Sequence, residues 1–121
     1  MAFYTLGIHL YGLALRVAAW FHPKARKWVK GRQNWVEQHR ELSAALPENR
    51  PLFWFHCASL GEFEQGRPLI EKLKARNRPP LILLTFYSPS GYEIRQKYPQ
   101  ADVVAYLPLD TPAQARAFVA I

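Results

Sequence analysis

The sequence predicts an α/β fold in which helices cover a parallel sheet. Three short apolar runs, at residues 52–57, 81–86 and 103–107, have the length and the unbroken hydrophobicity of buried strands. A helical pattern follows each run, and strands that alternate with helices in this way form parallel sheets through right-handed crossovers. We therefore expect three strand–helix units that together make the first half of a Rossmann-like domain.

An apolar stretch at residues 3–21 precedes the predicted sheet, with aromatic residues near both ends and with His9 and Arg16 as polar interruptions. The stretch is just long enough to cross a bilayer, but its polar interruptions weaken the insertion signal. We expect a membrane anchor or an interfacial helix over residues 1–22, with a helix packed on its own domain as the alternative. The basic residues follow the apolar stretch, which argues against a cleaved signal peptide.

Residues 23–50 form a basic and polar connecting segment. Its first part carries five cations within nine residues: Lys24, Arg26, Lys27, Lys30 and Arg32. Placed directly after an apolar stretch, such a cluster would remain on the cytoplasmic side of a membrane. The sequence Pro-Glu-Asn-Arg-Pro at residues 47–51 predicts a linker, so we expect the globular domain to cover residues 51–121.

The first strand of that domain, residues 52–57, leads into a turn of small residues at 58–61. A helix is predicted over residues 62–75, because its apolar side chains recur at helical spacing. These are Phe63, Leu69, Ile70 and Leu73. Pro68 lies in the middle of this range, and we expect it to begin the first turn of a restarted helix, where a missing N–H costs least.

The second strand, residues 81–86, follows two prolines and leads into a turn at residues 87–91. We expect a short helix over residues 92–98 and a third strand over residues 103–107. A helix-start signal comes next, with Asp110 or Thr111 as the N-cap and Pro112 in the first turn, and the final helix covers residues 113–121.

Composition narrows the classes of function. The 121 residues are 50% hydrophobic and 14% aromatic, which excludes a disordered chain, and they make at most one domain. The formal net charge of +7 favours an anionic partner. Basic residues next to an apolar stretch favour a membrane surface, and no nucleic-acid-binding motif is present in the sequence. Cys57 is the single cysteine, so neither an internal disulfide nor a cysteine-based metal site is expected.

Two turns are the candidate functional segments. In a parallel sheet, the turns after the first and second strands, Ser59–Glu62 and Ser88–Gly91, open on the same edge, where ligands bind in open α/β sheets. Glu62 is the first charged residue after the first strand, well placed for proton transfer. A carboxylate in the first turn of a helix also has a purely structural explanation, since it opposes the helix dipole. His56 could be catalytic or simply a core histidine.

Other chemistries fit these residues less well. The sequence Cys-Ala-Ser-Leu-Gly at residues 57–61 has the strand–turn–helix setting of a nucleophile elbow. All four histidines precede Ser59, so the order of residues that this class of hydrolase needs is not met. Ser59–Glu62 also lacks the glycine spacing and the lysine of a phosphate-binding P-loop.

Four blocks of sequence are similar to a known family: Phe-His-Cys-Ala-Ser-Leu-Gly-Glu at 55–62, Arg-Pro-Leu-Ile at 67–70, Leu-Thr-Phe-Tyr-Ser-Pro-Ser-Gly-Tyr-Glu at 84–93, and Tyr-Leu-Pro-Leu-Asp-Thr at 106–111. In this order and spacing they resemble the N-terminal domain of 3-deoxy-D-manno-octulosonic acid (Kdo) transferases. That family has a two-domain GT-B fold. The resemblance implies that this chain supplies the N-terminal half, and that the C-terminal donor domain lies outside it.

The resemblance also implies an activity. It is an inverting, metal-independent transfer of Kdo from CMP-Kdo to the lipid A precursor (lipid IVA), at the cytoplasmic face of the inner membrane, in lipopolysaccharide biosynthesis. The family's Ser-Val-Gly-Glu motif corresponds to residues 59–62 here, which makes Glu62 the general base. No cofactor or metal is expected, and these 121 residues alone should be inactive.

Six residues of the two turns are expected to shape the acceptor pocket: Ser59, Leu60, Gly61, Ser88, Ser90 and Gly91. Two alternatives remain open at this point. One is a non-catalytic, membrane-docked Rossmann-like binding module, and the other is a different GT-B glycosyltransferase.

Overall fold

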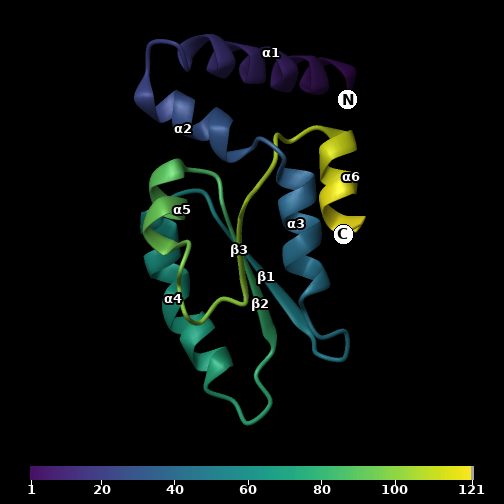
Figure 1. The fold of residues 1–121 in the computed structure, drawn as a ribbon, viewed down its shortest axis with the longest axis vertical. Coiled ribbons are helices and arrows are strands. Elements are labelled where there is room, and N and C mark those ends of the chain that lie inside the picture. Colours follow the sequence, from purple (N-terminus) through teal and green to yellow (C-terminus); the bar gives the residue numbers. More distant parts are fainter. Residues whose placement is uncertain (121) are drawn as a thin grey trace. The chain divides into compact units, whose positions relative to one another are not determined.

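The structure, a computed structural model, describes residues 1–120. The elements in chain order are α1 (Ala2–Ala18), α2 (Pro23–Gly31), α3 (Trp35–Ala44), β1 (Leu52–Cys57), α4 (Leu60–Lys74), β2 (Leu81–Phe86), α5 (Pro89–Arg95), β3 (Val103–Tyr106) and α6 (Pro112–Ala120) (Figure 1). They belong to two compact units, which are described separately. One contains Met1–Arg40 and the segment from Pro108 onward, and the other contains Glu41–Leu107.

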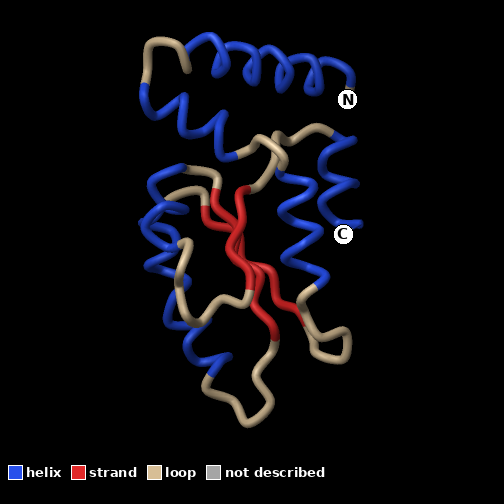
Figure 2. Tube along the Cα trace, viewed as in Figure 1, coloured by secondary structure: helices blue, strands red, loops and turns tan. Residues whose placement is uncertain are grey.

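The unit Glu41–Leu107 is built on a parallel sheet of three strands in the order β1-β2-β3. The strands are coloured red in Figure 2. The register pairs Leu52 with Leu81 at one end of β1 and Cys57 with Phe86 at the other. All pairs along β1, β2 and β3 are parallel. The predicted α/β class with a parallel sheet is therefore confirmed, and the first two strands have the predicted bounds.

The core of this unit lies between the sheet and α4. Alternate residues of the strands, Cys57 on β1 and Phe86 on β2, point to the face that α4 covers, where they pack with Phe63, Ile70 and Leu73 of that helix. The rings of Phe63 and Phe86 lie 5.9 Å apart between centroids. Each buried side chain of this size stabilises the fold by about 1.5–3 kcal/mol, so this face fixes α4 against the strands.

The predicted start of α4 at Glu62 and the predicted break at Pro68 are both wrong. The helix begins at Leu60, because the Ser59 hydroxyl caps it by accepting a hydrogen bond from the Glu62 N–H at 3.3 Å. It then continues through Pro68 to Lys74. A proline inside a helix costs about 3 kcal/mol. Burial of apolar side chains on both sides of Pro68 offsets that cost, whereas Leu69, expected on the apolar face, is 54% exposed.

The short helix after β2 also starts earlier than predicted. It covers Pro89–Arg95 instead of residues 92–98, because Ser88 is its N-cap and Pro89 occupies the first helical position. The predicted turn at residues 87–91 therefore shrinks to its first two residues. The third strand ends one residue early, at Tyr106.

In the other unit, α1 and α2 pack together, with the rings of Tyr11 and Trp28 edge to face at 6.3 Å. Helices α3 and α6 meet where the His39 ring stacks on Phe118 with centroids 4.1 Å apart. The His39 Nε2 atom also lies 3.2 Å from the Phe118 carbonyl oxygen. Burial lowers the pKa of His39, and this hydrogen bond opposes the shift.

The segment at residues 23–50, expected as a polar connection, contains the helices α2 and α3. Helix α6 begins at Pro112, one residue before the predicted range, and Pro112 lies in its first turn as predicted. The predicted end at residue 121 lies outside the described residues. Of the two predicted N-caps, Thr111 is the one that caps the helix. Its hydroxyl oxygen accepts a hydrogen bond from the Gln114 N–H at 3.3 Å. One cation of the basic cluster has a structural role, because Arg26 donates hydrogen bonds to the carbonyls of Ala19 and Trp20 just beyond α1.

The apolar stretch near the N-terminus forms α1, which has 17 residues. Within residues 1–120, no helix is both long enough and apolar enough to cross a membrane. Much of the apolar surface of α1 and of the segment after it is exposed, including Phe3 at 90% and Phe21 at 83%. An interfacial position for this helix stays a prediction. The division of the chain into an anchor (residues 1–22), a connecting segment (residues 23–50) and an acceptor-binding domain (residues 51–121) stays a prediction as well.

Candidate functional site

The two turns predicted to share one edge of the sheet lie side by side. Their backbones are joined by two hydrogen bonds, from the Tyr87 N–H to the Cys57 carbonyl at 3.3 Å and from the Ser88 N–H to the Ala58 carbonyl at 3.0 Å. The parallel ladder between β1 and β2 thus continues beyond both strands. As a result, the N-termini of α4 and α5 open at the same edge.

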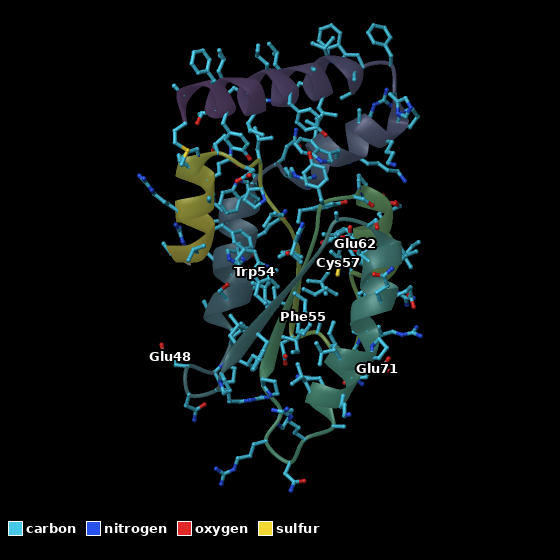
Figure 3. All side chains as sticks on the ribbon, turned by 180° about the vertical axis from the view of Figure 1, so that it is seen from behind. Glu48, Trp54, Phe55, Cys57, Glu62 and Glu71 are labelled. Carbon is cyan, nitrogen blue, oxygen red and sulfur yellow. The ribbon has the colours of Figure 1, made fainter. Side chains whose placement is uncertain are left out.

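Glu62 lies at this edge, in the first turn of α4 (Figure 3). Its carboxylate oxygen Oε2 accepts a hydrogen bond from the backbone N–H of Ala58 at 2.5 Å. Its own N–H donates to the hydroxyl of Ser59. These two bonds form a reciprocal cap, related to the capping box, that fixes the carboxylate over the end of β1.

The environment of Glu62 suits proton transfer from a ligand. The residue is exposed, and its second oxygen, Oε1, accepts no hydrogen bond from any residue that the structure describes. A carboxylate held by one oxygen and open at the other can accept a proton from a hydroxyl group placed within hydrogen-bond reach. The geometry therefore supplies a positioned base at an accessible sheet edge.

Cys57 lies just below this carboxylate and is not suited to covalent chemistry. Its side chain is 5% exposed. Burial raises the pKa of the thiol, and the negative charge of Glu62 raises it further. A thiol with a raised pKa stays protonated and is a poor nucleophile, so Cys57 acts as a small apolar residue of the core.

The other predicted residues of the first turn, Leu60 and Gly61, are the first two residues of α4. Leu60 is partly buried and packs on the core. Gly61 is exposed, and a Cβ built there would meet only the Ser59 hydroxyl, at 3.8 Å. Packing within the chain therefore does not require glycine at position 61, and the backbone at this position is accessible from solvent.

In the second turn, Ser88 and Ser90 join through their hydroxyls at 2.9 Å, and the Ser88 hydroxyl also caps α5 by accepting from the Gly91 N–H at 3.1 Å. Gly91 is buried. A Cβ there would lie 2.6 Å from the Phe86 ring and 3.4 Å from the Leu60 nitrogen. Close packing between the two turns thus explains Gly91, whereas the exposed Ser90 remains able to contact a ligand.

His56 lies on the other face of the sheet from Cys57, because side chains alternate along a strand. Its Nδ1 atom is 3.0 Å from the hydroxyl oxygen of Thr85, its partner in the register. The Trp54 ring nitrogen donates to the same hydroxyl at 2.8 Å. Sequence reasoning missed Thr85, a polar residue inside an apolar strand. The cluster lies on the face of the sheet opposite the one that α4, the helix of Glu62, covers.

Metal ligands are not grouped in the part of the chain that the structure describes, since no three His, Cys, Asp or Glu side chains lie together there as a metal ion requires. The candidate site consequently consists of one positioned carboxylate and the hydroxyl and amide groups of the two turns around it.

Comparison with known proteins connects this site to a family. A sequence model of the family described as 3-deoxy-D-manno-octulosonic-acid transferase (kdotransferase) matches residues 30–121, which include both turns. No solved structure matches the chain.

Two curated relatives carry the same description. A 3-deoxy-D-manno-octulosonic acid transferase of Aquifex aeolicus (strain VF5) is 39% identical over 75 residues, covering 61% of this chain and 20% of the relative. A probable mitochondrial 3-deoxy-D-manno-octulosonic acid transferase of Arabidopsis thaliana is 28% identical over 116 residues, covering 88% of this chain and 26% of the relative. The chain thus spans between a fifth and about a quarter of the length of these relatives. Because the family model matches most of the chain, the chain belongs to the Kdo transferase family.

Proposed function

We propose that this chain is the acceptor-binding, N-terminal portion of a GT-B glycosyltransferase that transfers Kdo from CMP-Kdo to the lipid A precursor (lipid IVA). The observation that carries the proposal is the position of Glu62. Its carboxylate is fixed by Ala58 at the open edge of a parallel sheet, inside the region that matches the family. Family membership supports Kdo as the transferred sugar.

In the proposed reaction, Glu62 takes the proton of an acceptor hydroxyl as the hydroxyl oxygen attacks the anomeric carbon of Kdo. A new carbon–oxygen bond forms on one face of the sugar. The bond to the phosphate oxygen of CMP breaks on the opposite face, and CMP leaves with the bonding electrons. Attack from the opposite face inverts the anomeric centre. A base in this position contributes on the order of 10²–10⁴-fold to the rate, and this step needs no metal ion.

The acceptor would lie against the two turns. Ser59, Gly61 and Ser90 are the exposed members of the predicted set of six, and they lie in the two turns at the same edge as Glu62. The donor nucleotide would bind to residues outside this chain, in a C-terminal domain.

We further propose that the chain works on the cytoplasmic face of the inner membrane, with α1 lying in the interface. Support comes from the exposed apolar side chains of α1 and of the residues that follow it, such as Phe3, Trp20 and Phe21. Basic residues of α2, among them Lys24 and Lys30, are exposed as well, and they would attract anionic lipid headgroups.

The proposal is tested by a transfer assay on the complete protein that contains this chain. CMP-Kdo and lipid IVA are supplied, and both CMP release and Kdo-modified lipid are measured. We expect the two products in equal amounts. Consumption of a different nucleotide sugar would instead identify another GT-B glycosyltransferase, and lipid binding without any sugar transfer would identify a binding module.

A further inference from the structure

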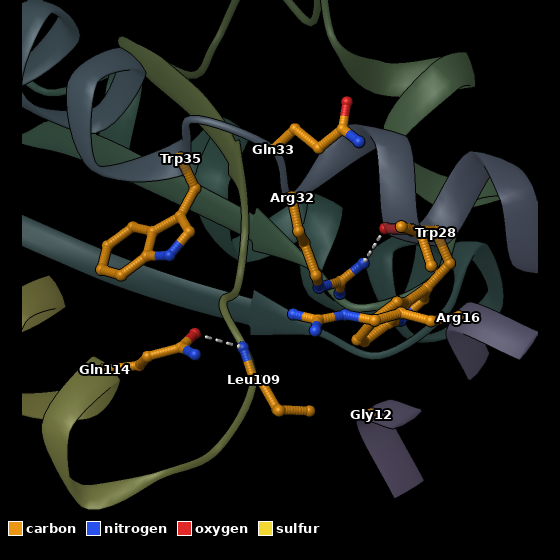
Figure 4. A pocket seen from close by; sticks show the side chains of 9 residues that line it. Gly12, Arg16, Trp28, Arg32, Gln33, Trp35, Leu109 and Gln114 are labelled. Atoms are coloured by element: carbon orange, nitrogen blue, oxygen red, sulfur yellow. Dashed lines mark hydrogen bonds between the residues drawn. The ribbon is translucent and has the colours of Figure 1, made fainter. Parts of the chain in front are cut away.

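A cavity of about 440 Å³ lies within the unit formed by Met1–Arg40 and the segment from Pro108 onward. Its lining comes from α1, α2, the start of α3 and α6, and Figure 4 shows the side chains that surround it. The members that decide its chemistry are Arg16, Trp28, Arg32, Trp35, Leu109 and Gln114. Its volume falls within the range of about 300–1,000 Å³ typical of small-molecule sites.

The cavity is electropositive. Arg16 from α1 and Arg32 from the end of α2 both line it, and arginine is always protonated in proteins. Its lining, as far as the structure describes it, includes no aspartate or glutamate. Two like charges at one cavity repel each other, so an anion between them would relieve the repulsion and gain attraction from both.

Arg32 is held in place before any ligand arrives. Its guanidinium carbon lies 3.9 Å from the centre of the Trp28 ring, and its Nη1 atom donates to the Trp28 carbonyl at 3.3 Å. Stacking uses the face of the guanidinium, whereas its N–H donors lie in the plane, in a fork that matches the oxygens of a phosphate. The stacked arrangement is therefore compatible with binding an anion and lowers the entropy cost of doing so.

Gln114 adds a neutral donor. Its Oε1 atom accepts a hydrogen bond from the Leu109 N–H at 3.1 Å, which orients the side-chain amide and makes the remaining group, Nε2, a donor. Trp35 and Leu109 form an apolar part of the cavity wall. A ligand that fits this lining has an anionic oxygen-rich group joined to an apolar part.

We propose that this cavity binds the phosphate group of an anionic membrane lipid, with Arg16 and Arg32 as its phosphate ligands and Trp28, Trp35 and Leu109 against the apolar part of the lipid. The choice of a lipid over free phosphate rests on the proposed function, since it assumes that α1 lies at a membrane. Arg16 belongs to the same helix that exposes Leu6, Leu10 and Leu13. The site would thus hold one lipid headgroup beside the helix that contacts the bilayer.

The test is calorimetric titration of the full 121-residue chain with dihexanoyl phosphatidic acid, a soluble lipid with a phosphate monoester. The variants Arg16→Gln and Arg32→Gln are compared with the matched controls Arg76→Gln and Arg78→Gln, which remove the same charge from exposed positions outside the cavity. A lost charge-assisted hydrogen bond costs about 1.5–3 kcal/mol, so each arginine variant should bind roughly tenfold more weakly or worse. Each control should stay within about twofold of the unsubstituted chain.

One further variant and two further ligands distinguish a specific lipid-phosphate site from loss of folding and from unspecific anion binding. Arg32→Lys keeps the charge but loses the fork, so it should bind more weakly than the unsubstituted chain and more tightly than Arg32→Gln, a pattern that loss of folding would not produce. Inorganic phosphate should bind far more weakly than the lipid, and equal binding would overturn the lipid as ligand. Dihexanoyl phosphatidylcholine, a zwitterionic lipid, should not compete.

Arginine variants that bind as tightly as the unsubstituted chain would overturn the site. This titration needs no CMP-Kdo, so its failure would leave the proposed sugar transfer standing. Conversely, absence of CMP-Kdo turnover with intact lipid binding would overturn the transfer and leave the lipid-phosphate site in place.

Discussion

The carboxylate of Glu62 turns back onto the chain and accepts a hydrogen bond from the N–H of Ala58, with 2.5 Å between Oε2 and the nitrogen. In an ordinary capping box the glutamate reaches the N–H of the capping residue itself, which is Ser59 here. Glu62 reaches one residue further back, to the turn that leaves β1. The same bond thus closes the cap of α4 and fixes the carboxylate at the carboxyl edge of the sheet.

Ser59→Ala should destabilise the protein, because the Glu62 N–H loses the hydroxyl that accepts from it. Loss of an N-cap serine costs about 1 kcal/mol, within a range of 0.5–2. Urea denaturation measures the change in the free energy of unfolding. Ser59→Thr keeps a capping hydroxyl and should stay close to the unsubstituted protein, so equal losses in both variants would show that the cap contributes nothing.

Two glycines should respond in opposite directions to alanine. At Gly91 the new methyl group would lie 2.6 Å from the buried Phe86 ring, so Gly91→Ala should destabilise the protein by about 1–3 kcal/mol. At Gly66, inside α4, a Cβ would meet nothing within 4 Å, and Gly66→Ala should stabilise by up to about 1 kcal/mol. Thermal unfolding of both variants gives the comparison, and a stable Gly91→Ala would contradict the close packing of the two turns.

The sheet could be predicted from the sequence because its strands are unbroken apolar runs with turn-forming residues at their ends. Helix starts were missed by two or three residues, since serine, glycine and proline near the starts of α4 and α5 are typical turn residues, although Leu60 and Phe63 lie at helical spacing. Helices α2 and α3 were missed because they are mostly polar, and their stability depends on the few side chains that they bury, such as Trp28 and His39.

The candidate site was predictable in position but not in detail. The order of strands and turns placed Ser59–Glu62 and Ser88–Gly91 at one edge, as the structure confirms. The hydrogen bond from the Ala58 N–H to Glu62 depends on where the backbone N–H of the turn points, and the order of side chains in the sequence does not predict that orientation. The cavity lined by Arg16 and Arg32 could not be predicted, because its lining residues come from α1, α2 and α6, and the cavity forms only when these segments, distant in the sequence, pack together.

His39 should make stability depend on pH. Burial lowers its pKa in the folded state below the ordinary value of 6.5, although the bond to the Phe118 carbonyl opposes the shift. The unfolded chain therefore takes up the proton first as the pH falls. The contribution of His39 is fully present above about pH 6.5 and is lost as the pH falls toward the lower folded value.

The check is urea denaturation at pH 7.5 and at pH 5.5. His39→Gln keeps a side-chain N–H for the Phe118 carbonyl but cannot titrate, so the loss of stability between the two pH values should be smaller than in the unsubstituted protein. His9→Gln removes an exposed histidine and should keep the original difference. An unchanged pH difference in His39→Gln would contradict the assignment.

The central claim is that the carboxylate of Glu62 is the base for sugar transfer, and Glu62→Gln tests it most directly in the complete protein with CMP-Kdo and lipid IVA. The amide oxygen can still accept from the Ala58 N–H, so folding should be preserved, but an amide cannot take the acceptor proton. We expect kcat to fall by about 10²–10⁴-fold, with lipid binding largely intact. Glu48→Gln, in an exposed loop, should have no effect. Turnover of Glu62→Gln within about twofold of the unsubstituted enzyme would remove Glu62 from the mechanism.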